Sequence, residues 1–83
     1  MKTRITYFAL AGDAIKIGCT RAIKTRMTTL QVSSRHKVEL LKTAAIDERE
    51  AHAIAATLAP RQAGEWFQAT EELIEWIDQL ESV

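Results

Sequence analysis

Two pairs of residues combine types and spacings that can do chemistry. Glu48 and His52 are four residues apart, so on a helix the carboxyl group and the imidazole lie one above the other. A carboxylate can anchor a hydrated Mg²⁺ or Mn²⁺, and a neighbouring imidazole can orient that carboxylate. Tyr7 and Lys16 form the second pair, because a tight hairpin places them on one face of a sheet. Both pairs depend on the elements that carry them.

A β-hairpin is predicted at the start of the chain. Residues 4–10 and 14–19 are short runs rich in aromatic and β-branched residues, and an Ala-Gly-Asp sequence separates them. A two-residue turn with glycine first fixes the register of the hairpin. The paired residues are Ala11 with Ala14, Ala9 with Lys16, and Tyr7 with Gly18. Side chains alternate along each strand, so this register puts Tyr7 and Lys16 on the same face.

The middle of the chain predicts a helix and a third strand. Thr20 can cap a helix over residues 21–31, whose apolar side chains recur every three or four positions with Arg26 at the border of the stripe. A polar loop over residues 32–36 then precedes a strand over residues 37–45. The three strands predict an antiparallel or mixed sheet.

Two further helices are predicted in the second half. Asp47 and Glu50 have the spacing of a capping box, and the helix they begin runs to about residue 59, before Pro60. Residues 61–68 are predicted to be irregular, and Thr70 caps a last helix. The predicted fold class is therefore α/β (α+β), a small three-stranded antiparallel sheet flanked by about three helices in the order β-β-α-β-α-α.

The composition predicts one small globular domain over residues 1–83. Of the 83 residues, 47% are apolar and 27% are charged. No stretch has the roughly 20 uncharged apolar residues of a membrane helix, and no secretory signal is recognisable, which predicts a cytoplasmic protein without a membrane partner. The single cysteine, Cys19, cannot form an internal disulfide and is expected to be a small buried side chain. Trp66 and Phe67 are expected to fill the core.

The net charge of zero hides two oppositely charged halves. Residues 1–42 contain nine Lys or Arg and two acids, whereas residues 43–83 contain two arginines and nine acids, which gives +7 against −7. A basic half favours a polyanionic partner, and an acidic half suggests a solvated face or carboxylates that hold a metal. Alternatively, the division serves only solubility or self-association. The candidates for contact with nucleic acid are Arg21, Lys24, Arg35 and Lys37.

Several short motifs stand in a fixed order along the chain. They are Tyr7-Phe8, Lys16-Ile17-Gly18, Arg26 eight residues after that glycine, Glu48 with His52, and Gly64-Glu65-Trp66-Phe67. Together they resemble the GIY-YIG nuclease superfamily, and the last motif is similar to the Gly-Glu-Trp-Phe signature of a short phage and bacterial branch. In this comparison Ile5 stands at the glycine of the first motif, and Lys16 stands at the second tyrosine.

The resemblance implies a metal-dependent phosphodiesterase site on one sheet face. Its catalytic residues map onto Tyr7, Lys16, Arg26 and Glu48, with Gly18 and His52 as neighbours of the site. Glu48 would anchor Mg²⁺ or Mn²⁺, and Arg26 would contact the phosphate and stabilise its developing charge. Tyr7 and Lys16 would deprotonate or orient the attacking water. Their ordinary pKa values of about 10 require that a metal, Arg26 or their mutual contact lower one of them.

Each of these residues also has a purely structural interpretation. Tyr7 can be a strand aromatic that packs against a helix, and Lys16 can be a solvated lysine of the sheet. Glu48 can do no more than stabilise a helix N-terminus. His52 can be half-buried with a backbone partner, the usual state of a lone histidine beside an apolar stripe.

The sequence favours a metal-dependent endonuclease that hydrolyses phosphodiester bonds in DNA, with RNA left open as a substrate. The alternative is a catalytically degenerate module of the same kind that binds nucleic acid or a protein partner, for example a phage factor against host defence. A partner protein would supply specificity, because so small a domain has little surface for sequence recognition. The oligomeric state is left open.

Overall fold

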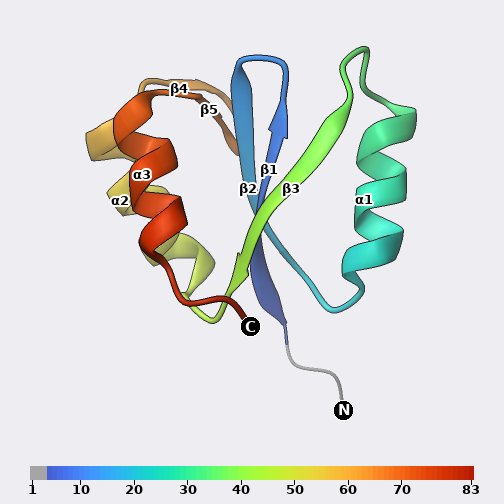
Figure 1. Cartoon of the computed structure of the whole chain (residues 1–83), viewed down its shortest axis with the longest axis horizontal. Helices are drawn as coiled ribbons and strands as arrows, with labels where there is room; N and C mark the ends of the chain where they lie inside the picture. The colour runs from blue at the N-terminus through green and yellow to red at the C-terminus, as the bar shows by residue number, and fades with distance from the viewer. Residues whose placement is uncertain (1–3) are drawn as a thin grey trace.

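Five strands and three helices make up the computed structural model, which describes residues 4–83. Their bounds are β1 (Ile5–Ala11), β2 (Ala14–Thr20), α1 (Ile23–Val32), β3 (Val38–Ala44), α2 (Glu48–Leu58), β4 (Arg61–Ala63), β5 (Trp66–Gln68) and α3 (Glu71–Gln79). All strand pairs are antiparallel, and the sheet has the order β3-β1-β2-β5-β4. Helix α1 lies on one side of the sheet, whereas α2 and α3 lie on the other (Figure 1). The α+β class with three helices is as predicted.

The hairpin of β1 and β2 has the predicted register. Ala11 lies opposite Ala14, and Tyr7 lies opposite Gly18. Gly12 has a φ of 63°, a left-handed conformation that glycine adopts without steric cost and that the tight turn requires. The side chains of Tyr7 and Lys16 therefore share one face of the sheet.

The prediction of a three-stranded sheet was wrong. The segment expected to be irregular, residues 61–68, forms β4 and β5, so the order is β-β-α-β-α-β-β-α. Gly64, with a φ of 54°, allows the reversal between them. Strands of three residues are too short to show an alternating pattern, and β5 is held by its pairing with residues 14–16 of β2. That pairing is a tertiary contact, which local sequence does not encode.

Two of the three helix starts are as predicted. The Asp47 carboxylate accepts hydrogen bonds from the backbone N–H groups of Arg49 and Glu50, and the Thr70 hydroxyl accepts one from Leu73. Helix α1, in contrast, begins two residues later than expected. The Thr20 hydroxyl accepts a hydrogen bond from the Ala22 backbone at 3.0 Å, before the helix starts. Among the described residues, no helix is long and apolar enough to cross a membrane.

The core lies between the sheet and the pair α2 and α3. Phe8, Ile15 and Ile17 on the sheet face are fully buried together with Phe67 of β5. The expectation for Phe67 is therefore confirmed, whereas Trp66 is only half-buried. Helix α1 has no fully buried residue, so it covers the opposite sheet face without forming a second core of similar size.

The buried ring of Phe67 gives the first test of this packing. Because its side chain is fully buried, we expect Phe67→Ala to lower the free energy of unfolding by about 3–5 kcal/mol. Val32→Ala is the matched control, since the Val32 side chain is 83% exposed, and it should change the free energy by less than about 0.5 kcal/mol. Urea unfolding measures both. Equal losses of unfolding free energy in the two variants would contradict the burial of Phe67 in the core.

Candidate active site

Tyr7 lies on the sheet face that is turned toward α1, and it is 1% exposed. Its ring occupies the space above Gly18, where a Cβ atom would stand 2.6 Å from the tyrosine hydroxyl oxygen. A residue with a side chain at position 18 would therefore displace the ring. The third member of this group is Arg26 on α1, whose exposed guanidinium is near enough for its charge to act on the Tyr7 hydroxyl.

The surroundings of Tyr7 raise its pKa above 10.0. Burial is the largest cause, and the negative charges of Glu65 and Glu48 act in the same direction, while the positive charge of Arg26 opposes them. Arg26 lowers the pKa of Tyr7 less than burial raises it. Tyr7 keeps its proton at neutral pH.

This pKa can be measured directly, because Tyr7 is the single tyrosine of the chain. We expect the near-ultraviolet absorbance of tyrosinate to rise with a midpoint above pH 10.0, and Arg26→Ala to move the midpoint still higher. The folded protein holds this proton more tightly than the unfolded chain, so the associated stability is lost as the pH rises through the folded pKa. Lys24→Ala is the control on the same helix. A midpoint at or below 10.0 that Arg26→Ala leaves unchanged would contradict the arrangement.

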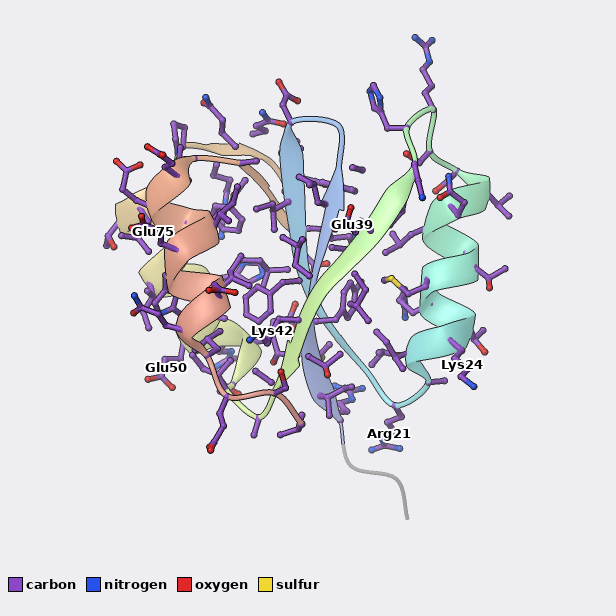
Figure 2. All side chains as sticks on the ribbon, in the orientation of Figure 1. Arg21, Lys24, Glu39, Lys42, Glu50 and Glu75 are labelled. Carbon is purple, nitrogen blue, oxygen red and sulfur yellow. The ribbon has the colours of Figure 1, made fainter. Side chains whose placement is uncertain are left out.

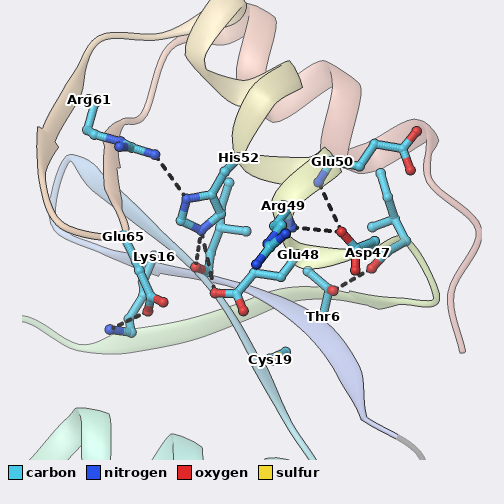
Figure 3. Close-up of polar contacts among 12 residues, drawn as sticks. Thr6, Lys16, Cys19, Asp47, Glu48, Arg49, Glu50, His52, Arg61 and Glu65 are labelled. Atoms are coloured by element: carbon cyan, nitrogen blue, oxygen red, sulfur yellow. Dashed lines mark hydrogen bonds and ion pairs between the residues drawn. The ribbon is translucent and has the colours of Figure 1, made fainter.

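Lys16 and Glu65 form an ion pair beside Tyr7. The Lys16 Nζ atom lies 3.2 Å from Glu65 Oε1, with the two side chains 19% and 44% exposed. The lysine also lies over the Trp66 ring, 5.6 Å from its centroid. Sequence reasoning gave Glu65 no role, although it belongs to the Gly-Glu-Trp-Phe motif. Lys16 is therefore neither free nor fully solvated, as Figure 3 shows.

Glu48 and His52 are adjacent at the start of α2, as their spacing predicts. The His52 Nε2 atom lies 3.6 Å from Glu48 Oε2, and it donates a hydrogen bond to the backbone carbonyl of Ile17 at 2.8 Å. The other ring nitrogen, Nδ1, accepts a hydrogen bond from Arg61 at 3.1 Å (Figure 3). His52 is thus half-buried with a backbone partner and also touches Glu48. No sequence signal pointed to Arg61.

The edge of β2 brings the two sides of the site together. The pairing of β2 with β5 covers residues 14–16 and stops before Ile17. Other groups therefore bond the backbone of Ile17 on this side. Its backbone N–H donates to the carbonyl of Glu65 at 3.0 Å, and its carbonyl accepts from His52. The carboxyl groups of Glu48 and Glu65 and the His52 imidazole therefore converge, with one ligand atom of each within 4.8 Å of the others.

Glu65 is ionised at neutral pH in this arrangement. Burial by itself would raise its pKa, but hydrogen bonds with Glu48 and Lys16, together with the positive charge of Lys16, outweigh burial and hold the pKa below 4.5. A carboxylate that stays charged while partly buried can bind a cation. Its position beside Glu48 makes this edge a candidate metal centre.

A cavity of about 380 Å³ opens on the far side of Glu48, with Arg4, Cys19 and Arg49 among its lining residues. Cys19 is half-exposed rather than buried as expected, and Arg4 donates to its sulfur at 3.9 Å. A hydrogen bond with Glu48, followed by burial, raises the pKa of the Cys19 thiol. The thiol is thus protonated at neutral pH and has no nucleophilic character.

The two charged halves of the sequence become two sides of the molecule. Arg21 and Lys24 stand at the start of α1, and Glu50 and Glu75 lie on the opposite side with α2 and α3 (Figure 2). The basic residues predicted to contact nucleic acid are all exposed: Arg21, Lys24, Arg35 and Lys37. Arg26 is exposed on the same helix. Contact of this side with nucleic acid stays a prediction.

Comparison with known proteins gives one result. The family model of the T5orf172 domain matches residues 3–81, which is nearly the whole chain. No curated protein and no solved structure matches. The match includes every residue of the site described above.

Proposed function

The chain belongs to the T5orf172 domain family, and on this premise we propose that it is a GIY-YIG-type endonuclease that hydrolyses phosphodiester bonds in DNA with a divalent cation. The family is a phage-type domain associated with nuclease-like folds. One observation carries the proposal: a buried tyrosine in the sheet lies close enough to Arg26, Glu48 and Glu65 for their charges to act on its hydroxyl. These are groups of the kind that bind a phosphate and a hard cation.

The residues present fit a divalent cation. Glu48 is 27% exposed, so its carboxylate is accessible yet held in place by its contact with His52. Oxygen donors suit Mg²⁺ and Mn²⁺, and Mg²⁺ characteristically takes one or two carboxylates and completes its shell with water and substrate phosphate. A bound cation would supply positive charge to the phosphate and lower the pKa of a coordinated water molecule.

The remaining residues bind and orient the phosphate. The exposed guanidinium of Arg26 is accessible to a DNA phosphate. It can donate two N–H hydrogen bonds to the phosphate oxygens as negative charge develops on them. The Tyr7 hydroxyl keeps its proton, so we assign it the role of donating a hydrogen bond rather than of deprotonating water. Lys16, held by its ion pair with Glu65, adds positive charge beside the phosphate. His52 positions Glu48.

A second candidate function is a binding module of the same fold without turnover. The ion pair between Lys16 and Glu65 favours it, because Lys16 stands where the resemblance expects a tyrosine and is already neutralised. Such a module would use the exposed basic side around α1 to contact DNA. Its affinity would fall steeply with salt and would be indifferent to divalent cations and to Glu48.

Nicking of supercoiled plasmid separates the two candidates. We expect the purified protein to convert the plasmid to open-circular or linear DNA in Mg²⁺ or Mn²⁺, and EDTA to stop the reaction. Circular dichroism on the same preparation establishes that the protein is folded. A folded protein that shifts the plasmid on a gel but leaves it supercoiled in both cations would favour the binding module.

A further inference from the structure

We propose that Glu65 is a second carboxylate ligand, so that the divalent cation sits between Glu48 and Glu65. This inference rests on the proposed function but goes beyond it, because that function requires only Glu48. The two residues come from separate segments, the start of α2 and the turn between β4 and β5. The centre would therefore form only when β5 is paired with β2.

The backbone holds Glu65 in the required place. Gly64, with its φ of 54°, makes the turn, and the carbonyl of Glu65 accepts a hydrogen bond from the Ile17 N–H at 3.0 Å. His52, which lies 3.6 Å from Glu48, bonds the carbonyl of the same Ile17. The backbone of Glu65 and the imidazole beside Glu48 are thus both bonded to one residue of β2. A ligand atom of each carboxyl group lies within 4.8 Å of the other.

The carboxyl groups of Glu48 and Glu65 concentrate negative charge at this edge of the sheet. The two carboxyl groups converge there, and the ammonium group of Lys16 contacts Glu65 at 3.2 Å. A divalent cation between the carboxylates would compensate their charge and take over part of the role of Lys16 at Glu65.

The Tyr7 side chain, which is 1% exposed, lies near this pair of carboxyl groups. The charges of Glu48 and Glu65 both act on its hydroxyl. A cation bound between the two carboxyl groups would therefore also act on Tyr7.

The chemistry of the donors selects the metal. Both nitrogens of His52 are engaged, so the ligands available without rearrangement are carboxylate oxygens. Oxygen ligands suit Mg²⁺ and Mn²⁺, whereas Zn²⁺ prefers nitrogen and sulfur donors. His52 is accordingly a positioning residue for Glu48 and not a ligand.

Direct measurement of Mn²⁺ binding tests the second ligand without reference to cleavage. Electron paramagnetic resonance of free Mn²⁺ is recorded during titration of the full chain, with and without a short DNA duplex. We expect Glu65→Gln to weaken binding by at least about tenfold and Glu48→Gln to weaken it as much or more. Glu50→Gln is the matched control, because Glu50 is exposed on the same helix as Glu48, and it should leave the affinity unchanged.

The outcomes distinguish this inference from the proposed function. If Glu65→Gln binds Mn²⁺ like the wild type while Glu48→Gln does not, Glu65 is not a ligand. The assignment of Glu48 as the cation ligand is then kept. If the wild type binds no Mn²⁺ even with DNA, the two-carboxylate centre is wrong, and plasmid nicking decides the proposed function separately. Circular dichroism identifies any variant that fails to fold, and Glu65→Ala, which keeps the same backbone bond to Ile17, then replaces Glu65→Gln.

Discussion

Replacing Glu48 by Gln is expected to slow plasmid nicking by about 10³-fold or more, the largest effect in this protein. The amide keeps the size of the side chain but removes the charge that would hold the divalent cation. Loss of one preorganised electrostatic group typically costs 10²–10³-fold, on the order of the effect of an oxyanion donor, and loss of the cation adds to it. Rates measured at saturating Mn²⁺ give the comparison.

The control for Glu48→Gln is Glu50→Gln on the same helix. Both residues lie in the first turn of α2, so both substitutions remove a similar interaction with the helix dipole, worth about 0.3–1 kcal/mol. Only Glu48 contacts His52. Glu50→Gln should therefore cleave at the wild-type rate. Equal rates for wild type and Glu48→Gln would contradict the assigned role of Glu48.

Arg26→Ala is expected to have the second largest effect, a loss of about 10²–10³-fold in the cleavage rate at saturating DNA. The guanidinium is exposed on α1 and acts on the Tyr7 hydroxyl, so it is placed to stabilise charge that develops on a phosphate beside the tyrosine. Arg26→Lys should recover only part of the rate, because an ammonium group lacks the planar pair of donors. Single-turnover rates measure this loss separately from binding.

Lys24→Ala provides the contrast for Arg26. Lys24 is exposed on the same helix, but it is not among the groups that act on Tyr7. We expect it to weaken DNA binding uniformly across sequences and to reduce the salt dependence by about one counterion, while the rate at saturating DNA is unchanged. Similar losses of rate in Lys24→Ala and Arg26→Ala would show that α1 contributes only general basic charge.

Much of the fold follows from local signals. The Gly12-Asp13 turn sets the register of β1 and β2, and the caps at Asp47 and Thr70 set the starts of α2 and α3. The short strands β4 and β5 could not be predicted in the same way, because three residues carry no periodicity and β2, with which β5 pairs, is more than forty residues away in the chain. The late start of α1 reflects Thr20 remaining in β2.

The candidate site shows the same division between local and tertiary information. The contact of Glu48 with His52 follows from helical geometry, and the shared face of Tyr7 and Lys16 follows from the hairpin. The place of Glu65 required β5 to pair with β2, which brings its carboxylate to Lys16. The raised pKa of Tyr7 could not be predicted from the sequence, because burial, which depends on the whole fold, outweighs the neighbouring Arg26.

The most direct test of the nuclease assignment measures binding and cleavage on one preparation of the wild-type protein. A labelled DNA duplex or junction is first bound in EDTA and scored by gel shift, and Mn²⁺ or Mg²⁺ is then added under single-turnover conditions. We predict that the bound DNA is cut after either cation is added, and that Glu48→Gln binds the same DNA without cutting it. DNA that is bound by the folded wild type and stays intact in both cations would contradict the assignment.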